Sequence, residues 1–155
     1  MLYEEAEPTP LRRRARRLLY VVLAFVLVVM GAQRLTGRDD RAARALTLAR
    51  MRQVREALDR YAIDNSGQIP NTSQGLRALL SPPTLPPEPP NWCGPYLSQP
   101  QMIFDGWGHK FHYASPGGGS PPRPYDLWSL GKDNLQGGTG AAADVQSWEP
   151  ETLRP

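Results

Sequence analysis

The sequence has one cysteine, almost no lysine and none of the common catalytic motifs. Because Cys93 has no partner in the chain, an internal disulfide is excluded, and the fold must be held by a hydrophobic core or by a bound ion. Ser129 and Ser147 do not lie in a nucleophile-elbow pattern, and Cys93 has no activating neighbour. We therefore expect that the protein is not an enzyme and has no catalytic residue.

Neither a disulfide at the single cysteine nor a zinc site at the two histidines is the expected arrangement. Cys93 fits a small buried hydrophobic residue, with an intermolecular disulfide as the alternative. His109 and His112 both carry nitrogen ligands, but in a strand a separation of three residues places them on opposite faces. A shared zinc ion is therefore not expected there.

An uncharged apolar run, Leu18 to Ala32, directly follows the arginine cluster LRRRARR. No aromatic residues interleave these arginines, so they indicate a membrane flank and not a nucleic-acid-binding surface. The run is shorter than the roughly 20 residues of a typical spanning helix, although arginine stems at its ends can reach the interface. We predict a basic cytoplasmic N-terminus over residues 1–17 and a single transmembrane anchor over 18–33, contacting the lipid bilayer. A cleavable signal peptide is the alternative.

A long helix is predicted next, because residues 39–63 contain neither proline nor glycine and are rich in alanine, leucine and arginine. Apolar side chains recur there at steps of three and four and form one stripe. The stripe consists of Leu48, Met51, Val54, Leu58 and Tyr61. We predict an amphipathic spine helix over residues 34–64 whose stripe requires a partner surface, and which could continue unbroken from the apolar run.

Residues 65–155 are predicted to form the exported globular region. Either Asn65 or Gly67 can adopt the left-handed conformation that ends the spine helix. The segment TSQGLRALL has the pattern of a short second helix, capped by Thr72 or Ser73. The proline-rich stretch that follows, between residues 81 and 90, indicates an extended surface loop, with a ligand for proline-recognition domains as the alternative.

Two later segments have strand composition. KFHYAS and YDLWSLG are rich in aromatic and β-favouring residues, and the proline-rich connection between them is too long for a tight hairpin. Two or three antiparallel strands would offer an apolar face to the stripe of the spine helix. The fold class predicted from the residues is therefore α+β, a long N-terminal helix packed on a small antiparallel sheet.

The glycine-rich segment from Leu130 to Asp144 has the composition of a calcium loop. Calcium takes about six to eight oxygen ligands from carboxylates, amides, backbone carbonyls and water. Candidate oxygens belong to Asp133, Asn134, Gln136, Thr139 and Asp144. The segment does not match the EF-hand pattern, and on residue chemistry alone a flexible glycine-rich surface loop is the alternative.

Several segments together resemble the major pseudopilins of type II secretion systems. QVREALDRYAIDNSGQIPNTSQGLRALL resembles the end of the family's spine helix with its turn and following helix, and NWCGPYL resembles its Asn-Trp-x-Gly-Pro-Tyr-Leu motif. DGWGHKFHY resembles the family's Asp-x-Trp-Gly entry to a strand, and YDLWSLGKDNLQGG its entry to a calcium loop. The match extends from about Gln53 to Glu149, in the family's order.

The resemblance implies a pseudopilin-like fold and a structural function. Family members are anchored in the inner membrane and assemble into a short periplasmic pseudopilus. An inner-membrane platform with a cytoplasmic ATPase pushes this pseudopilus to move folded proteins through an outer-membrane secretin. The expected partners are copies of the chain or other pseudopilin-like subunits, the secretion platform and the lipid bilayer, and no nucleic acid.

The resemblance also implies a calcium ion in the C-terminal loop. Carried over by position, Asp133 and Asp144 supply carboxylates, and Leu130 and Leu135 supply backbone carbonyls. Where the family usually has another Asp, this chain has Ala142. We expect weaker calcium binding for that reason, with water or Thr139 filling the gap, since the number of charged ligands tunes affinity.

The N-terminal segment departs from the family, because it lacks the Gly-Phe cleavage site and the following Glu. The resemblance therefore implies neither processing by prepilin peptidase nor polymerisation in the usual way. The main hypothesis is a pseudopilin-like subunit, with contacts between copies through the stripe that contains Leu48, Met51 and Val54. The alternative is a non-polymerising, single-pass anchored protein whose periplasmic domain binds a ligand or an envelope partner.

Overall fold

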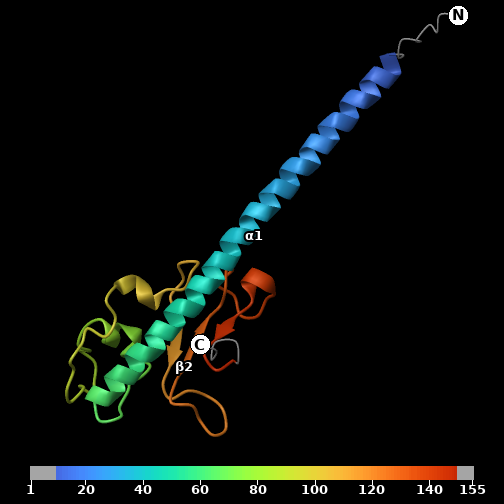
Figure 1. Ribbon diagram of the computed structural model, residues 1–155. Helices are drawn as coiled ribbons and strands as arrows, with labels where there is room; N and C mark the ends of the chain where they lie inside the picture. The colour runs from blue at the N-terminus through green and yellow to red at the C-terminus, as the bar shows by residue number, and fades with distance from the viewer. Residues whose placement is uncertain (1–9, 150–155) are drawn as a thin grey trace, which may run out of the picture. The chain divides into compact units, whose positions relative to one another are not determined.

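The computed structural model describes residues 10–149, and within its long helix the side chains of residues 19–26 and from Arg38 onward. Helix α1 extends from Pro10 to Asp64 (Figure 1). The chain divides into two compact units, residues 1–39 and 40–155. The predicted cytoplasmic N-terminus and part of the predicted anchor lie outside the described side chains.

In the first unit, the side chains of residues 19–26 are apolar or aromatic and exposed, with Leu19 at 65% and Phe25 at 68%. Across the described residues, no helix meets the length and apolarity that a membrane crossing requires.

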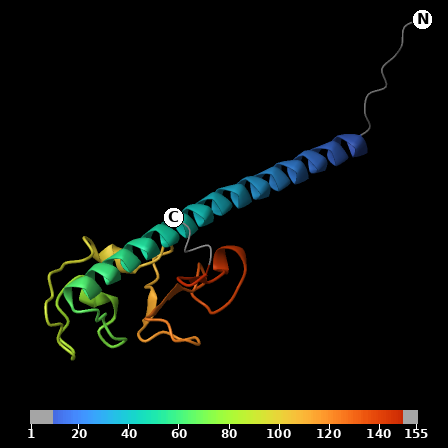
Figure 2. The same ribbon diagram turned by 60° about the horizontal axis from the view of Figure 1, so that its bottom comes forward.

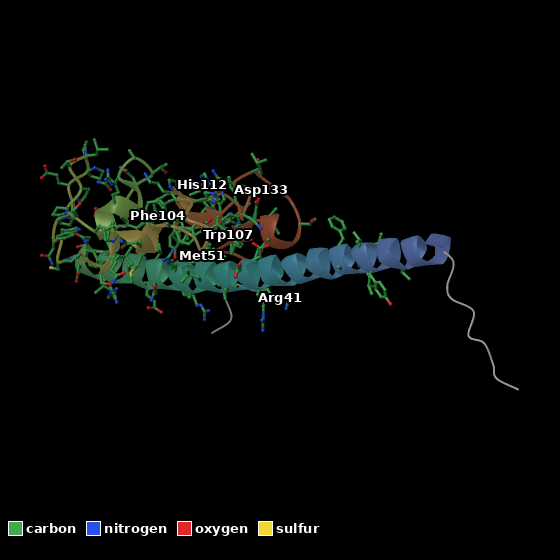
Figure 3. The ribbon with its side chains drawn as sticks, turned by 90° about the horizontal axis from the view of Figure 1, so that it is seen from above. Arg41, Met51, Phe104, Trp107, His112 and Asp133 are labelled. Carbon is green, nitrogen blue, oxygen red and sulfur yellow. The ribbon has the colours of Figure 1, made fainter. Side chains whose placement is uncertain are left out.

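In the second unit, the predicted apolar stripe of α1 is buried. Met51, Val54, Leu58 and Tyr61 are at most 2% exposed, and Leu48 packs against the same core. Figure 3 shows Met51 directed from α1 toward the globular part, whereas Arg41 points away from it. The stripe is therefore the inner face of the helix, as the periodicity predicted.

A three-stranded antiparallel sheet packs on this helix, in the order β1-β2-β3 (Figures 1 and 2). The strands are β1 at His112–Ala114, β2 at Asp126–Ser129 and β3 at Val145–Gln146. Leu127 on β2 and Val145 on β3 are buried and belong to the core. The two predicted strand segments are confirmed in shortened form, and the third strand closes the glycine-rich loop.

The connections contain three short 3-10 helices. They are η1 at Gly75–Leu79, η2 at Pro100–Ile103 and η3 at Gly140–Ala142. The predicted capping of the second helix by Thr72 or Ser73 is wrong. Asn71 Oδ1 accepts from the Gln74 amide at 2.9 Å, and Gln74 Oε1 accepts from the Asn71 amide at 3.0 Å. Thr72 instead exchanges hydrogen bonds with the backbone of Ser115, which ties this turn to the end of β1.

At the end of α1, the prediction of a left-handed residue at Asn65 or Gly67 is confirmed for Gly67. Gly67, with φ 82°, and Ser66, with φ 58°, adopt the left-handed conformation, and Asn65 does not. Asn65 is fully buried, where its side-chain amide donates to Tyr61 O and its Oδ1 accepts from the Asn91 amide. Asn65 therefore fastens the helix end to the segment after the proline-rich loop.

Cys93 is exposed, so the prediction of a small buried hydrophobic residue is wrong. The neighbouring Trp92 supplies the buried contact instead. Its indole nitrogen donates to Ala78 O at 2.9 Å, and its ring meets Tyr96 edge-on at 5.8 Å. The larger aromatic ring fills the space at the core, and the thiol is left on the surface.

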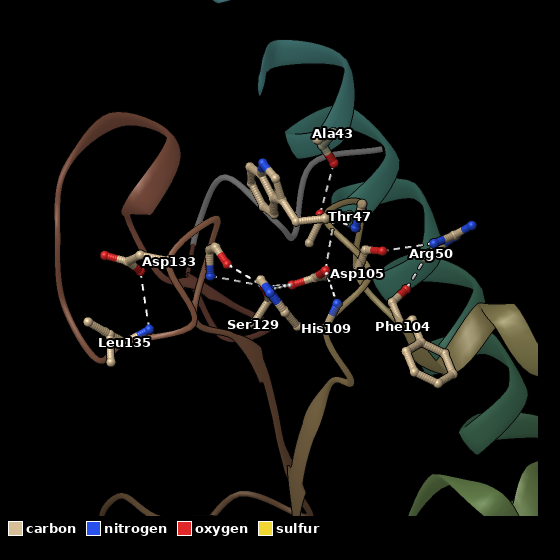
Figure 4. A network of polar contacts seen from close by, with 12 residues as sticks. Ala43, Thr47, Arg50, Phe104, Asp105, His109, Ser129, Asp133 and Leu135 are labelled. Atoms are coloured by element: carbon tan, nitrogen blue, oxygen red, sulfur yellow. Dashed lines mark hydrogen bonds and ion pairs between the residues drawn. The ribbon is translucent and has the colours of Figure 1, made fainter. Parts of the chain in front are cut away.

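The loop after η2 lies so close to the backbone of α1 that position 106 has no room for a side chain. The Gly106 amide donates to Thr47 Oγ1 at 2.9 Å, and Thr47 Oγ1 donates in turn to Ala43 O at 2.9 Å (Figure 4). Arg50 donates to Asp105 O at 2.8 Å and to Phe104 O at 3.2 Å. A glycine is required at position 106, because a Cβ there would overlap the carbonyl oxygen of Ala43.

Gly106→Ala is expected to lower the free energy of unfolding by about 2–4 kcal/mol, because the new methyl group must push the loop off the helix backbone. Urea denaturation of the full chain measures this change. Gly108→Ala is the matched control, since a Cβ at 108 meets nothing within 4 Å and costs only the left-handed strain of about 1–2 kcal/mol. A smaller loss at position 106 than at 108 would contradict this account of the contact.

Candidate functional site

The glycine-rich loop between β2 and β3 has a defined backbone. The Lys132 amide donates to Ala141 O at 3.0 Å. A Cβ at Gly131 would lie 2.8 Å from the carbonyl carbon of Ala142, so the two ends of the loop meet too closely for a side chain there. Figure 2 shows the loop, in orange to red, returning to the sheet through η3.

The two predicted carboxylate ligands fix the backbone of the loop from within. Asp133 Oδ1 accepts from the Leu135 amide at 3.1 Å (Figure 4), and both oxygens of Asp144 accept from the Gly137 amide at 3.1 and 3.2 Å. Leu130 directly follows β2, and Asp144 directly precedes β3. Since Ser129 and Val145 are paired in the sheet, Leu130 and Asp144 lie at the mouth of the loop.

The chemistry of these donors suits a hard cation. Among the described residues, no group of three or more His, Cys, Asp or Glu side chains could hold a metal ion. An ion here would depend on two carboxylates completed by backbone carbonyls and water, which is a ligand set for calcium and not for zinc.

A buried carboxylate lies beneath the mouth of the loop. Asp105 is fully buried, and its Oδ1 accepts from the amides of Trp107 and His109, each at 2.9 Å. Its Oδ2 accepts from Ser129 Oγ at 2.6 Å, and Ser129 Oγ accepts from the Gly131 amide at 3.1 Å. This chain of hydrogen bonds connects the loop that rests on α1 to the first residues of the glycine-rich loop (Figure 4).

The two histidines take part in different contacts. His109 Nδ1 lies 3.1 Å from Gly131 O and 3.7 Å from Asp105 Oδ2. The ring of His112 instead stacks on Trp128, with ring centroids 5.2 Å apart. The structure does not bring the two imidazoles together. Ser129 is fully buried, and its hydroxyl donates to Asp105 Oδ2.

The pKa values of two further side chains, Asp126 and Tyr113, are shifted by their surroundings. Arg123 holds the pKa of the Asp126 carboxyl below its ordinary value through hydrogen bonds of 2.6 and 3.2 Å. Burial raises the pKa of Tyr113, whose hydroxyl donates to Pro70 O at 2.6 Å. Asp126 is therefore ionised and Tyr113 protonated throughout the neutral range.

Comparison with known proteins identifies the family to which this fold belongs. The profile of the family described as "Type II secretion system (T2SS), protein G" matches residues 34–148. The chain belongs to this protein G family. The helix packed on a small antiparallel sheet is the pseudopilin-like fold.

Individual relatives of protein G are similar over most of their length. Type II secretion system core protein G of Pseudomonas aeruginosa is 34% identical over 133 residues, covering 85% of this chain and 89% of that protein. The Vibrio cholerae protein of the same name is 34% identical over 132 residues, covering 84% of this chain and 86% of the relative. A crystal structure described as the major pseudopilin from the type 2 secretion system of enterohaemorrhagic Escherichia coli has a TM-score of 0.58 and 34% identity. It covers 74% of this chain and 93% of that one.

For this protein G family member, sequence reasoning located the loop but missed the residue that supports it. In the sequence, Asp105 stands out only as part of a motif that introduces a strand. Its hydrogen bond with Ser129 was not predicted. The signal was an acidic residue directly before Gly-Trp-Gly, at a position where the chain turns. Such an aspartate can accept amides two and four residues later, as Asp105 does.

Ser129→Ala is expected to lower the free energy of unfolding by about 1–3 kcal/mol, because it leaves one oxygen of the buried Asp105 without its donor. Chemical denaturation of the full chain measures the loss. Ser98→Ala is the control, since Ser98 is exposed and its hydroxyl donates to Met102 Sδ at the long distance of 3.8 Å. Equal stability of the two variants would show that the Asp105–Ser129 bond does not support the fold.

Proposed function

We propose that this chain is a structural subunit of a type II secretion machine, acting through assembly with other pseudopilin-like subunits and not through catalysis. The observation that supports it most is the match to protein G over residues 34–148, which includes the helix and the packed domain. The proposed location is the inner membrane, anchored once through residues 18–33. The N-terminus would lie in the cytoplasm and the globular region in the periplasm, within reach of the secretion platform.

The hypothesis that copies meet through Leu48, Met51 and Val54 needs correction. Met51 and Val54 are buried within the subunit itself, and Leu48 packs against the same core. We propose that contacts between copies use the part of α1 that the core leaves exposed. Leu46 at 42% and Ile63 at 80% are exposed on α1, and such large apolar side chains are costly to leave in water.

Disulfide crosslinking in native membranes tests the assembly. In a Cys93→Ser background, Leu46→Cys or Ile63→Cys is expected to produce a crosslinked dimer of this chain, or a crosslink to another pilin-like subunit. Ser120→Cys, in the exposed loop between β1 and β2, is the control for random collision. A monomer at all three positions would favour the non-polymerising anchored protein whose periplasmic domain binds a ligand or an envelope partner.

We further infer that the loop from Leu130 to Asp144 binds calcium. The carboxylates of Asp133 and Asp144 and the carbonyls of Leu130 and Leu135 would hold it, with water or Thr139 completing the ligand set. A bound calcium ion would neutralise the two carboxylates and stabilise the closed form of the loop. The methyl group of Ala142 provides no ligand, so the affinity should be lower than with a third carboxylate.

Thermal melting of the full chain with calcium and then with excess chelator tests this proposal. Binding to the folded state alone adds about 2.7 kcal/mol when calcium is a hundredfold above Kd. Ala142→Asp should reach the same stabilisation at lower calcium, and Asp144→Asn should remove it. Magnesium, which prefers a smaller octahedral site, is the control ion. If neither the natural chain nor Ala142→Asp responded to calcium, the loop would not be a calcium site.

A further inference from the structure

The outer face of the sheet carries a row of large polar and aromatic side chains. His112, Trp128 and Gln146 are direct partners across the three strands. The alternate positions, Leu127 and Val145, are buried in the core, so the row faces away from α1. The match to the protein G family covers this row without giving it a function.

These side chains line a cavity of about 430 Å³. Its aromatic lining comes from Trp128, Trp148 and His112, and its polar lining includes Asp126, Gln136 and Asp144. Trp148 meets Trp128 edge-on, with ring centroids 6.5 Å apart. The volume is within the range of small-molecule sites, which is roughly 300–1,000 Å³.

The charges around the cavity disfavour an anionic ligand, and part of its lining is already in contact with a cation. Asp126 is already paired with Arg123, and the same guanidinium lies 4.4 Å from the ring centroid of Trp148. A cationic ligand would therefore meet a carboxylate and an indole that already have a cation. Asp144, whose oxygens accept from the Gly137 amide, would repel an anionic ligand.

We propose that this cavity binds a pyranose ring of a neutral glycan. Each face of a pyranose presents C–H groups that can pack on an indole ring. Its equatorial hydroxyls can donate hydrogen bonds to carboxylates, and they can both donate to and accept from side-chain amides. Trp128 and Trp148 supply the rings, and Gln136 and Asp144 supply polar groups. The proposal depends on the sheet face and stands without a calcium ion, although Asp144 belongs to both sites.

Indole N–H resonances report on this cavity directly, because two of the four tryptophans line it. The ¹⁵N-labelled full chain is titrated in a zwitterionic detergent that has no sugar headgroup. One probe is chitotetraose, which has the N-acetyl groups of cell-wall glycans, and the other is maltotetraose, which has none. We expect saturable shifts of the Trp128 and Trp148 indoles at millimolar probe. The indoles of Trp92 and Trp107, which do not line the cavity, should stay in place.

The variant Gln136→Ala provides the matched test, since Gln136 lies on an exposed loop and its loss leaves the sheet intact. Binding should weaken roughly three- to tenfold, as expected for one hydrogen bond. Gln101→Ala, also exposed but outside the cavity, should bind as the natural chain does. Shifts with one probe alone would support the site and identify the type of glycan.

The proposal is overturned if neither saccharide shifts the Trp128 and Trp148 indoles, or if all four indoles shift alike. It is also overturned if Gln136→Ala and Gln101→Ala bind equally well. Repeating the titration with chelator separates it from the calcium proposal. Indole shifts that persist in a chain without calcium binding would support the glycan site while the calcium site fails.

Discussion

The hydrogen bonds accepted by the buried carboxylate of Asp105 are the interactions on which the rest of the globular unit depends. Charge inside a protein is tolerated only when hydrogen-bond donors surround it. Here two backbone amides and a serine hydroxyl supply them. The donors come from the loop beside α1 and from the end of β2, so a single group determines how sheet, loop and helix meet. Gly106 then brings the same loop against the backbone of α1.

The elements that periodicity describes could be predicted from the sequence. The stripe through Met51, Val54 and Leu58 and the strand around Leu127 follow from spacing, because burial of one face imposes a repeat of 3.6 or of two residues. The residue that closes the turn before η1 and the exposure of Cys93 could not be predicted in this way. Whether Asn71 or Thr72 closes a turn depends on Ser115, which is distant in the sequence and competes for the threonine hydroxyl.

The candidate site was predictable in composition but not in arrangement. Asp133 and Asp144 were identified as oxygen donors, and the structure adds that each already holds a backbone amide of its own loop. The support beneath the loop was not predictable, because it runs through contacts such as Asp105 to Ser129, which join residues of separate segments. The aromatic row on the sheet was missed because register decides which side chains share a face.

The exposed thiol of Cys93 has a practical consequence. It is the only cysteine in the chain and lies outside both the loop and the aromatic cavity. A maleimide fluorophore or a nitroxide would therefore attach at one known surface position without any substitution. Placed on the natural protein, such a label would allow distances to other labelled molecules to be measured spectroscopically.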